Sequence, residues 1–197
     1  MDPNTFSGMK HFGLNLVEQP LSGLLLLEPT VHGDARGYFM ETFKSDSSEL
    51  LWKQDNESMS HRGVLRGLHF QRPPHAQAKL VSVVQGSVYD VVVDLRAGSP
   101  TYGKTYGALL SAANKRRLLI PAGFGHGFAT LEDGTIFQYR CSEVYAPEAE
   151  GCIAYNDADL GIDWLGATGL SASELQLSAK DEKGMAFASF ESPFKLY

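Results

Sequence analysis

The sequence predicts a mainly β protein, folded as a two-sheet β-sandwich or barrel with a few short helices. Short apolar or alternating runs recur between turn signals along most of the chain, a pattern typical of strands. The run over 88–95 is mostly apolar on both alternating faces, as expected for a strand covered on two sides. No linker, repeat or low-complexity tract divides the 197 residues, so we expect a single domain.

Individual elements follow from the same pattern. The predicted strands cover residues 24–28, 38–43, 67–70, 80–85, 87–95, 106–110, 118–121, 127–131 and 136–141. Gln85-Gly86 and Asp133-Gly134 are predicted hairpin turns, because glycine tolerates a positive φ. Residues 45–51 are the clear early helix candidate, and short helices are expected in the turn-rich region after residue 147. Residues 1–10 are predicted to be a disordered tail or a cloning remnant, ahead of one domain over 11–197.

The charge balance narrows the possible partners. Lys and Arg number 17 against 23 Asp and Glu, which gives a formal net charge of −6. General nucleic-acid binding needs a positive surface, so we expect no nucleic-acid partner. The chain has neither an apolar run of membrane-spanning length nor a signal-peptide pattern, so we expect a cytoplasmic protein with no membrane partner. Cys141 and Cys152 alone do not make a disulfide framework.

The most informative short stretch runs from Arg66 to Gln71 and reads Arg-Gly-Leu-His-Phe-Gln. Alternate side chains of a strand share a face, so His69 and Gln71 point the same way, with Arg66 across a glycine from them. A base, an amide and a guanidinium are the groups needed to hold a charged polar substrate and move its protons. A lone histidine is more often a buried structural residue, and these polar neighbours shift the balance toward catalysis.

A second stretch, over 121–126, reads Pro-Ala-Gly-Phe-Gly-His. It resembles the second sequence motif of the cupin jelly rolls, in which a turn feeds a strand whose histidine points into the barrel. Metal-binding cupins complete their site with an earlier His-x-His, but here that place reads His69-Phe70-Gln71. Lys79 follows nearby, and an ammonium group repels a divalent cation. We therefore expect no metal, and a metal-dependent cupin enzyme is the less favoured alternative.

Segments spread from about residue 24 to residue 181 resemble the dTDP-4-dehydrorhamnose 3,5-epimerase family. The matching segments, in order, are 33–41, 54–58, 64–71, 76–81, 89–96, 99–103, 120–128, 145–150 and 177–181. The resemblance implies a metal-free cupin-type jelly roll, a nucleotide-diphosphate sugar substrate and no cofactor. It also implies a homodimer that exchanges N-terminal strands.

The chemistry implied by the resemblance is proton transfer beside a ketone. Epimerisation needs a base on one face of the sugar, a cation at the enolate oxygen and an acid on the other face. The family's pattern places the base on His69, whose ring titrates near pH 6.5 when unperturbed, and a partner carboxylate on Asp181. Lys79 matches the enolate stabiliser and Tyr139 the acid, a hydroxyl that is protonated at neutral pH. Taken singly, Asp181 is better read as a residue of a short capped helix and Tyr139 as core.

Substrate-binding residues are carried over in the same way. Arg36 and Arg66 are expected at the diphosphate, where guanidinium groups suit paired oxygens. His126 is expected to help bind the sugar, although a buried structural histidine is an open alternative. The other carried-over substrate contacts are Glu41, Gln54, Asn56, Glu150 and Lys180.

The chain departs from the family pattern in a few places, which leaves alternatives open. Val144 stands where many members have a tyrosine associated with stacking on the nucleotide base, so dTDP is a default. Residues 188–197 have no recognised counterpart. The leading hypothesis is inversion of both C3 and C5 of a 4-keto-6-deoxy sugar. Alternatives are a C3-only or C5-only epimerase, possibly on another nucleotide, and a non-catalytic sugar-nucleotide-binding cupin.

Overall fold

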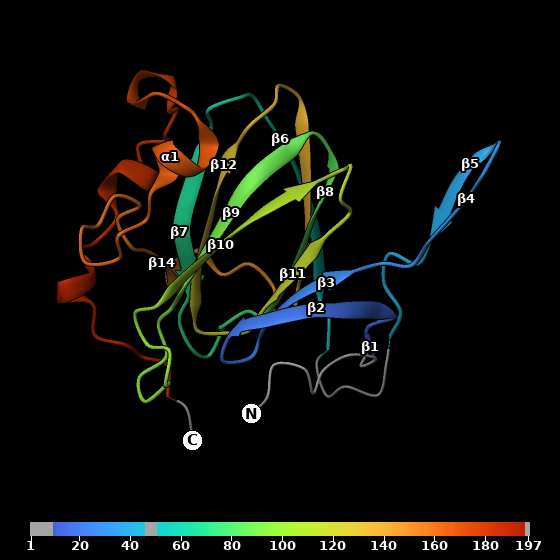
Figure 1. Cartoon of the computed structure of the whole chain (residues 1–197). Coiled ribbons are helices and arrows are strands. Elements are labelled where there is room, and N and C mark those ends of the chain that lie inside the picture. Colours follow the sequence, from blue (N-terminus) through green and yellow to red (C-terminus); the bar gives the residue numbers. More distant parts are fainter. Residues whose placement is uncertain (1–9, 46–50, 196–197) are drawn as a thin grey trace.

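Two antiparallel β-sheets pack face to face in the computed structural model, which describes residues 10–45 and 51–195 (Figure 1). The larger sheet has seven strands in the order β1-β2-β3-β11-β8-β13-β6, and the smaller has five in the order β10-β9-β12-β7-β14. A separate two-stranded hairpin, β4-β5, projects from the body as an arm. The predicted mainly β sandwich with few short helices is confirmed.

The strands of the seven-stranded sheet are β1 (Lys10–His11), β2 (Leu14–Leu21), β3 (Leu24–Glu28), β6 (Gln54–Ser60), β8 (Lys79–Gln85), β11 (Arg117–Ile120) and β13 (Thr135–Cys141). The five-stranded sheet contains β7 (Leu65–Gln71), β9 (Ser87–Asp94), β10 (Thr105–Ser111), β12 (Phe124–Thr130) and β14 (Glu150–Cys152). The arm is β4 (Val31–Asp34) and β5 (Gly37–Met40). The helices are η2 (Pro147–Ala149), α1 (Trp164–Thr168), η3 (Ala172–Glu174), η4 (Asp181–Lys183) and η5 (Phe187–Ser189).

Both predicted hairpins are wrong, although both turns exist. Gly86 and Gly134 have positive φ of 76° and 67°, as the turn signal required. The turn at Gly86 joins β8 to β9 and the turn at Gly134 joins β12 to β13, and in each case the two strands belong to different sheets. A glycine reverses the chain equally well whether or not the flanking strands pair. The turn signal therefore cannot distinguish a hairpin from a corner between sheets.

Strand β9 has the two-sided burial expected of it. Val92 contributes to the apolar core between the sheets, while Val91 and Val93 belong to a second core on the outer face of the five-stranded sheet. The C-terminal segment, orange to red in Figure 1, covers that outer face and supplies Trp164 and Phe190 to the second core. The described part of the C-terminal segment therefore encloses a second core.

The strands that the sequence did not predict are polar or interrupted. Strand β6 alternates half-buried and exposed side chains but carries no large apolar residue except Met59, and β2 contains Pro20. The predicted helix over 45–51 falls mostly on residues outside the described part, as does the predicted tail, apart from Lys10 in β1.

No helix of the described residues is long and apolar enough to cross a membrane.

Candidate active site

A cavity of about 310 Å³ opens between the two sheets. The five-stranded sheet contributes His69 from β7 and His126 from β12. The facing sheet contributes Lys79 from β8 and Tyr139 from β13. The complete lining is Gln54, Asn56, Ser58, Arg66, His69, Phe70, Gln71, Gln77, Lys79, His126, Gly127, Phe128, Phe137, Tyr139, Cys141, Tyr145 and Glu150.

Close packing of two glycines brings the two histidines together. A Cβ atom on Gly67 would lie 2.5 Å from the Cα of Gly127, so neither strand has room for a side chain at this crossing. Strand β12 shifts its register at the same point, and His126 is paired directly with His69. The glycines beside the two predicted histidines therefore serve close approach of the strands.

His69 forms a tight pair with Asp181, which lies far away in the sequence on η4. The distance from His69 Nε2 to Asp181 Oδ1 is 2.7 Å. The carboxylate also accepts hydrogen bonds from the backbone N–H of Gly67 at 2.9 Å and from the hydroxyl of Ser178 at 2.5 Å. Burial raises the pKa of Asp181, but these hydrogen bonds outweigh burial and hold the pKa well below its ordinary value.

An ionised carboxylate can only accept hydrogen bonds, so Asp181 fixes the tautomer of His69. In the neutral form of the ring, Nε2 then carries the proton that points to Asp181, and Nδ1 has the lone pair. Nδ1 is buried and has no hydrogen-bond partner among the described residues. A buried acceptor without a partner calls for an explanation, and a catalytic base is one.

A second carboxylate lies beside the free nitrogen of His69. Glu150 Oε1 is 3.6 Å from Nδ1, and its other oxygen accepts a hydrogen bond from the hydroxyl of Tyr145 at 2.8 Å. Lys180 forms an ion pair with the same carboxylate. Burial raises the pKa of Glu150, but the hydrogen bonds from Lys180 and Tyr145 have the larger effect and leave the pKa below its ordinary value. Glu150 is therefore anionic at neutral pH and favours a positive charge on His69.

The opposite wall carries a cation and a weak acid. Burial lowers the pKa of the Lys79 ammonium, an effect opposed by Cys141, Asp90 and Glu150. Lys79 has no hydrogen-bond partner among the described side chains, which leaves its donors available to a ligand. Burial raises the pKa of Tyr139, so its hydroxyl holds its proton at neutral pH.

Several predicted residues lie outside this cavity. Arg36 lies at the tip of the arm and forms an exposed ion pair with Asp34 at 2.5 Å. Glu41 follows β5 and is exposed, and Lys180 reaches the site only through its ion pair with Glu150. The structure does not bring Arg36 and Glu41 to the cavity of their own chain.

The possible metal donors are poorly suited to a metal. The one cluster of histidine, cysteine and acidic groups found among the described residues is His69, Cys152 and Asp181. Burial, followed by Asp181, raises the pKa of the Cys152 thiol to about 12, so the thiolate that binds metals is scarce at neutral pH. Asp181 is already engaged by three neighbours.

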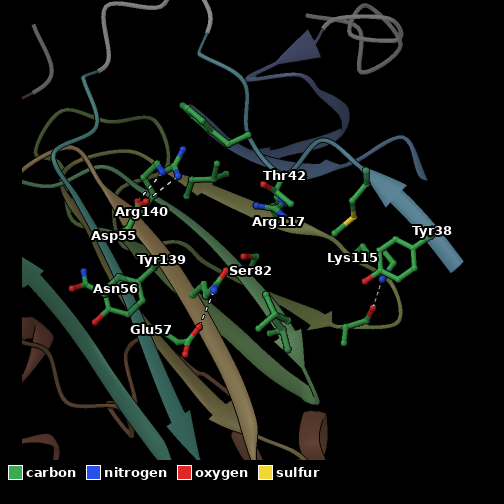
Figure 2. A pocket seen from close by; sticks show the side chains of 17 residues that line it. Tyr38, Thr42, Asp55, Asn56, Glu57, Ser82, Lys115, Arg117, Tyr139 and Arg140 are labelled. Carbon is green, nitrogen blue, oxygen red and sulfur yellow. Dashed lines mark hydrogen bonds and ion pairs between the residues drawn. The ribbon is translucent and has the colours of Figure 1, made fainter. Parts of the chain in front are cut away.

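A second cavity, of about 330 Å³, lies on the outer face of the seven-stranded sheet (Figure 2). Arg140 pairs with Asp55 at 2.7 Å, and the Lys115 ammonium lies 4.0 Å from the centre of the Tyr38 ring. No histidine occurs among the described residues that line this outer cavity. The groups suited to proton transfer therefore gather in the cavity between the sheets.

Comparison with known proteins decides the family. The family model described as dTDP-4-dehydrorhamnose 3,5-epimerase matches residues 18–189. The chain belongs to this family. It is similar to the dTDP-4-dehydrorhamnose 3,5-epimerase of Methanothermobacter thermautotrophicus, with 50% identity over 75% of this chain and 82% of the relative. The enzyme of the same name from Escherichia coli K12 is 45% identical over 86% of this chain and 92% of the relative.

Solved structures of the epimerase family match over nearly the whole chain. A dTDP-6-deoxy-D-glucose-3,5-epimerase from Legionella pneumophila, in complex with dTDP-4-keto-L-rhamnose, aligns with a TM-score of 0.85 and 40% identity, covering 93% of this chain and 98% of that one. A 3′-monoepimerase from Streptomyces bikiniensis, in complex with dTDP-quinovose, aligns with a TM-score of 0.79 and 36% identity, covering 87% of each chain. The predicted cupin-type jelly roll is confirmed.

The sequence reasoning missed Asp90, the partner of His126 in this candidate site. It is fully buried and lies 2.9 Å from His126 Nε2. A charged residue in the middle of a mostly apolar strand was the available signal. Gln71, by contrast, shares the face of His69 as predicted, but its amide is bonded to the backbone of His75, Val144 and Ala146. Gln71 therefore positions the loop before η2.

Proposed function

We propose that this protein inverts C3 and C5 of a nucleotide-linked 4-keto-6-deoxy sugar, converting dTDP-4-keto-6-deoxy-D-glucose to dTDP-4-keto-L-rhamnose. It is an isomerase of the dTDP-4-dehydrorhamnose 3,5-epimerase type. The observation that carries the proposal is the pair formed by an oriented base, His69, and a protonated acid, Tyr139, on opposite sheets of one cavity. Such a pair can remove a proton from one face of a sugar and return one to the other.

The first half of the reaction breaks a C–H bond beside the ketone. The ketone at C4 acidifies the hydrogens at C3 and C5, and Nδ1 of His69 is the free base that takes one of them. The electrons of that bond form a C=C bond, and the ketone oxygen becomes an enolate oxygen. Asp181 and Glu150 stabilise the resulting imidazolium, and the Lys79 ammonium stabilises the enolate.

The second half forms a new C–H bond from the opposite face. The Tyr139 hydroxyl gives its proton to the carbon, the C4 ketone re-forms, and the centre is inverted. Exchange with water returns a proton to Tyr139 and removes one from His69. The same groups then act at the second carbon, so a proton leaves and returns with no redox change. The reaction needs no cofactor.

We assign binding of the nucleotide half of the substrate to polar residues that line the cavity. Gln54 and Asn56 come from the inward face of β6, and their amides are bonded to each other at 2.8 Å. Arg66 is exposed at the cavity, and within the described part of the chain its guanidinium forms one hydrogen bond, to Ser60 at 3.2 Å. Its remaining guanidinium donors are suited to a diphosphate.

The arm supports a homodimer as the functional unit. It carries Tyr38 and Phe39 with 61% and 68% of their surfaces exposed, and its tip carries Arg36 (Figure 1). Apolar rings on a projecting hairpin indicate a surface covered by another chain. In the proposed dimer, the arm of one protomer brings Arg36 and Glu41 to the other protomer's substrate. A cytoplasmic location stays a prediction, as does the lack of nucleic-acid and membrane partners.

An epimerase that inverts one centre is the second candidate. The similarity to the Streptomyces 3′-monoepimerase keeps it open, because a base–acid pair of this kind serves one centre or two. Val144 keeps a different nucleotide base among the candidates, since it is 47% exposed beside Tyr145 and offers no ring face for stacking.

Incubation with dTDP-4-keto-6-deoxy-D-glucose in deuterated water tests the proposal. NMR of the sugar should show deuterium at both C3 and C5, together with the inverted product. Label at one carbon alone would establish the single-centre alternative, and no label with intact dTDP binding would establish a binding protein. His75→Ala is the matched control, because that imidazole lies outside the cavity and should leave labelling unchanged.

A further inference from the structure

The outer cavity on the seven-stranded sheet contains a buried guanidinium group, that of Arg117 (Figure 2). Arg117 lies on β11, the middle strand of that sheet, and only 8% of its surface is exposed. Its Nε is buried and has no hydrogen-bond partner in the described part of the chain. A buried cation without a partner is costly, so this group calls for an explanation.

The carboxylates around the outer cavity do not neutralise Arg117. Asp55 is engaged by Arg140 through two hydrogen bonds, at 2.7 and 2.9 Å. Glu57, the other described carboxylate in the lining, accepts a hydrogen bond from Gln138 at 2.8 Å. Burial, followed by the charge of Arg140, lowers the pKa of Arg117 to about 10, and no carboxylate of the described residues opposes this shift. Arg117 is therefore protonated at neutral pH, with its charge uncompensated.

Two further cations border the same space and have donors to spare. The Lys115 ammonium donates to the backbone carbonyl of Ala112 at 3.0 Å, which leaves two of its three hydrogens for a ligand. Arg140 uses Nε and one terminal nitrogen on Asp55, so its other terminal nitrogen is available. Three cationic side chains therefore line one cavity together with two carboxylates that are already bonded.

An oxyanion has the chemistry that these groups lack. Guanidinium groups bind the paired oxygens of phosphate and carboxylate groups through parallel hydrogen bonds. The cavity has a volume of about 330 Å³, roughly ten times the share of one water molecule in the liquid, so an anion of phosphate size fits with water around it. Such an anion would also remove the cost of leaving Arg117 unpaired.

We propose that the outer cavity is a binding site for a small oxyanion of the size and charge of inorganic phosphate, with the Arg117 guanidinium as its principal ligand and Lys115 and Arg140 as supporting donors. Asn56 and Tyr139 border both cavities, but Arg117 borders only this one. The site therefore does not depend on the proposed function. Because the anion binds the folded chain, it stabilises the fold.

Thermal unfolding of the full chain with and without inorganic phosphate tests the site, with sodium chloride used to match the ionic strength. Phosphate also stabilises proteins in general through its exclusion from their surfaces, so the informative quantity is the difference between the wild type and Arg117→Met at equal phosphate. At ten times the Kd for phosphate, the Tm of the wild type should rise by about 3–6 °C more than that of Arg117→Met. Equal rises in the two proteins would overturn the proposal.

Two control variants locate the bound phosphate. Arg116→Gln removes a charge one position away that lies outside the lining of the outer cavity, and it should keep the full phosphate response. Arg66→Gln removes a guanidinium group from the cavity between the sheets and should keep the response as well. Loss of the response in Arg66→Gln would place the phosphate between the sheets and refute the assignment to Arg117.

The stability of the Arg117 variants without phosphate separates a ligand site from a structural ion pair. Arg117→Met should unfold at or above the wild-type Tm, since it removes an unpaired buried charge and keeps an apolar stem. Arg117→Lys, which keeps the charge but loses the planar fork, should retain only part of the phosphate response. If Arg117→Met dissociates into single chains while the wild type ignores phosphate, a carboxylate of a second copy occupies the cavity and the anion site is wrong.

Discussion

Asp181→Asn isolates the charge of the proposed base's partner while keeping its shape. The amide oxygen can still accept the hydrogen bonds from Gly67 and His69, so the ring of His69 should stay in place. What is lost is the negative charge 2.7 Å from Nε2, together with the Oδ2 atom that accepts hydrogen bonds from Ser178. Proton transfer to His69 then creates an imidazolium with no charged partner on that side.

The size of the effect follows from the distance. With an effective dielectric constant of about 20, two unit charges 2.7 Å apart attract by about 6 kcal/mol. Glu150, 3.6 Å from the other ring nitrogen, still favours the imidazolium, so only part of this is lost. We expect the barrier to rise by about 3–5 kcal/mol, which corresponds to about 10² to 10⁴ in kcat.

The assay is the rate of deuterium incorporation at C3 and C5 of the sugar, with dTDP affinity measured in parallel. Asp181→Asn should lose exchange while binding dTDP like the wild type. Ser178→Ala, which removes one hydrogen bond from Asp181 and keeps its charge, is the graded control and should cost about tenfold. An Asp181→Asn enzyme whose exchange rate is within about threefold of the wild-type rate would refute the assignment of His69 as the catalytic base with Asp181 as its partner.

Four other predictions follow from the same site and fold. Tyr139→Phe should keep deuterium exchange at the sugar carbons but lose the inverted product, because the base remains and the opposite acid is gone; equal loss of both would contradict this. The activity of the wild type should fall on the alkaline side below the ordinary lysine pKa, since burial lowers the pKa of Lys79, and Lys79→Arg should remove this limb in a pH–rate profile. The depressed pKa of Asp181 contributes stability above about pH 4 that is lost as the pH falls, so Asp181→Asn should flatten the acid side of a urea-unfolding series, and parallel curves would contradict it. Phe190→Ala should lower the free energy of unfolding by about 3–5 kcal/mol, because its ring packs on Phe70 at 5.3 Å between centres, and a loss under 1 kcal/mol would show that the C-terminal segment seals nothing.

Much of the fold was predictable because its strands are apolar and regularly spaced. The predicted range 24–28 coincides with β3, and most other predicted strands differ from the observed ones by a few residues at their ends. Strand β6 was missed because its inward residues face a polar cavity, so the usual apolar alternation is replaced by Gln54, Asn56 and Ser58. The sheet to which a strand belongs was beyond the turn signals, as Gly86 and Gly134 show.

The site was predictable where a family motif identified it and unpredictable where only distance in space did. His69 and Lys79 occur in recognisable motifs, and both line the cavity. Asp181 lies more than a hundred positions after β7, so its pairing with His69 was predicted from the family motif over 177–181, and nothing else in the sequence indicates the 2.7 Å contact. Asp90 looked like one polar residue on a mostly apolar strand, and its contact with His126 emerges only from the fold.

The most direct test of the account compares the wild type with His69→Asn in deuterated water, using dTDP-4-keto-6-deoxy-D-glucose and reading C3 and C5 by NMR. The wild type should show label and inversion at both carbons. His69→Asn should show neither, and both proteins should still bind dTDP. Persistent label at either carbon in His69→Asn would contradict the claim that this histidine is the base.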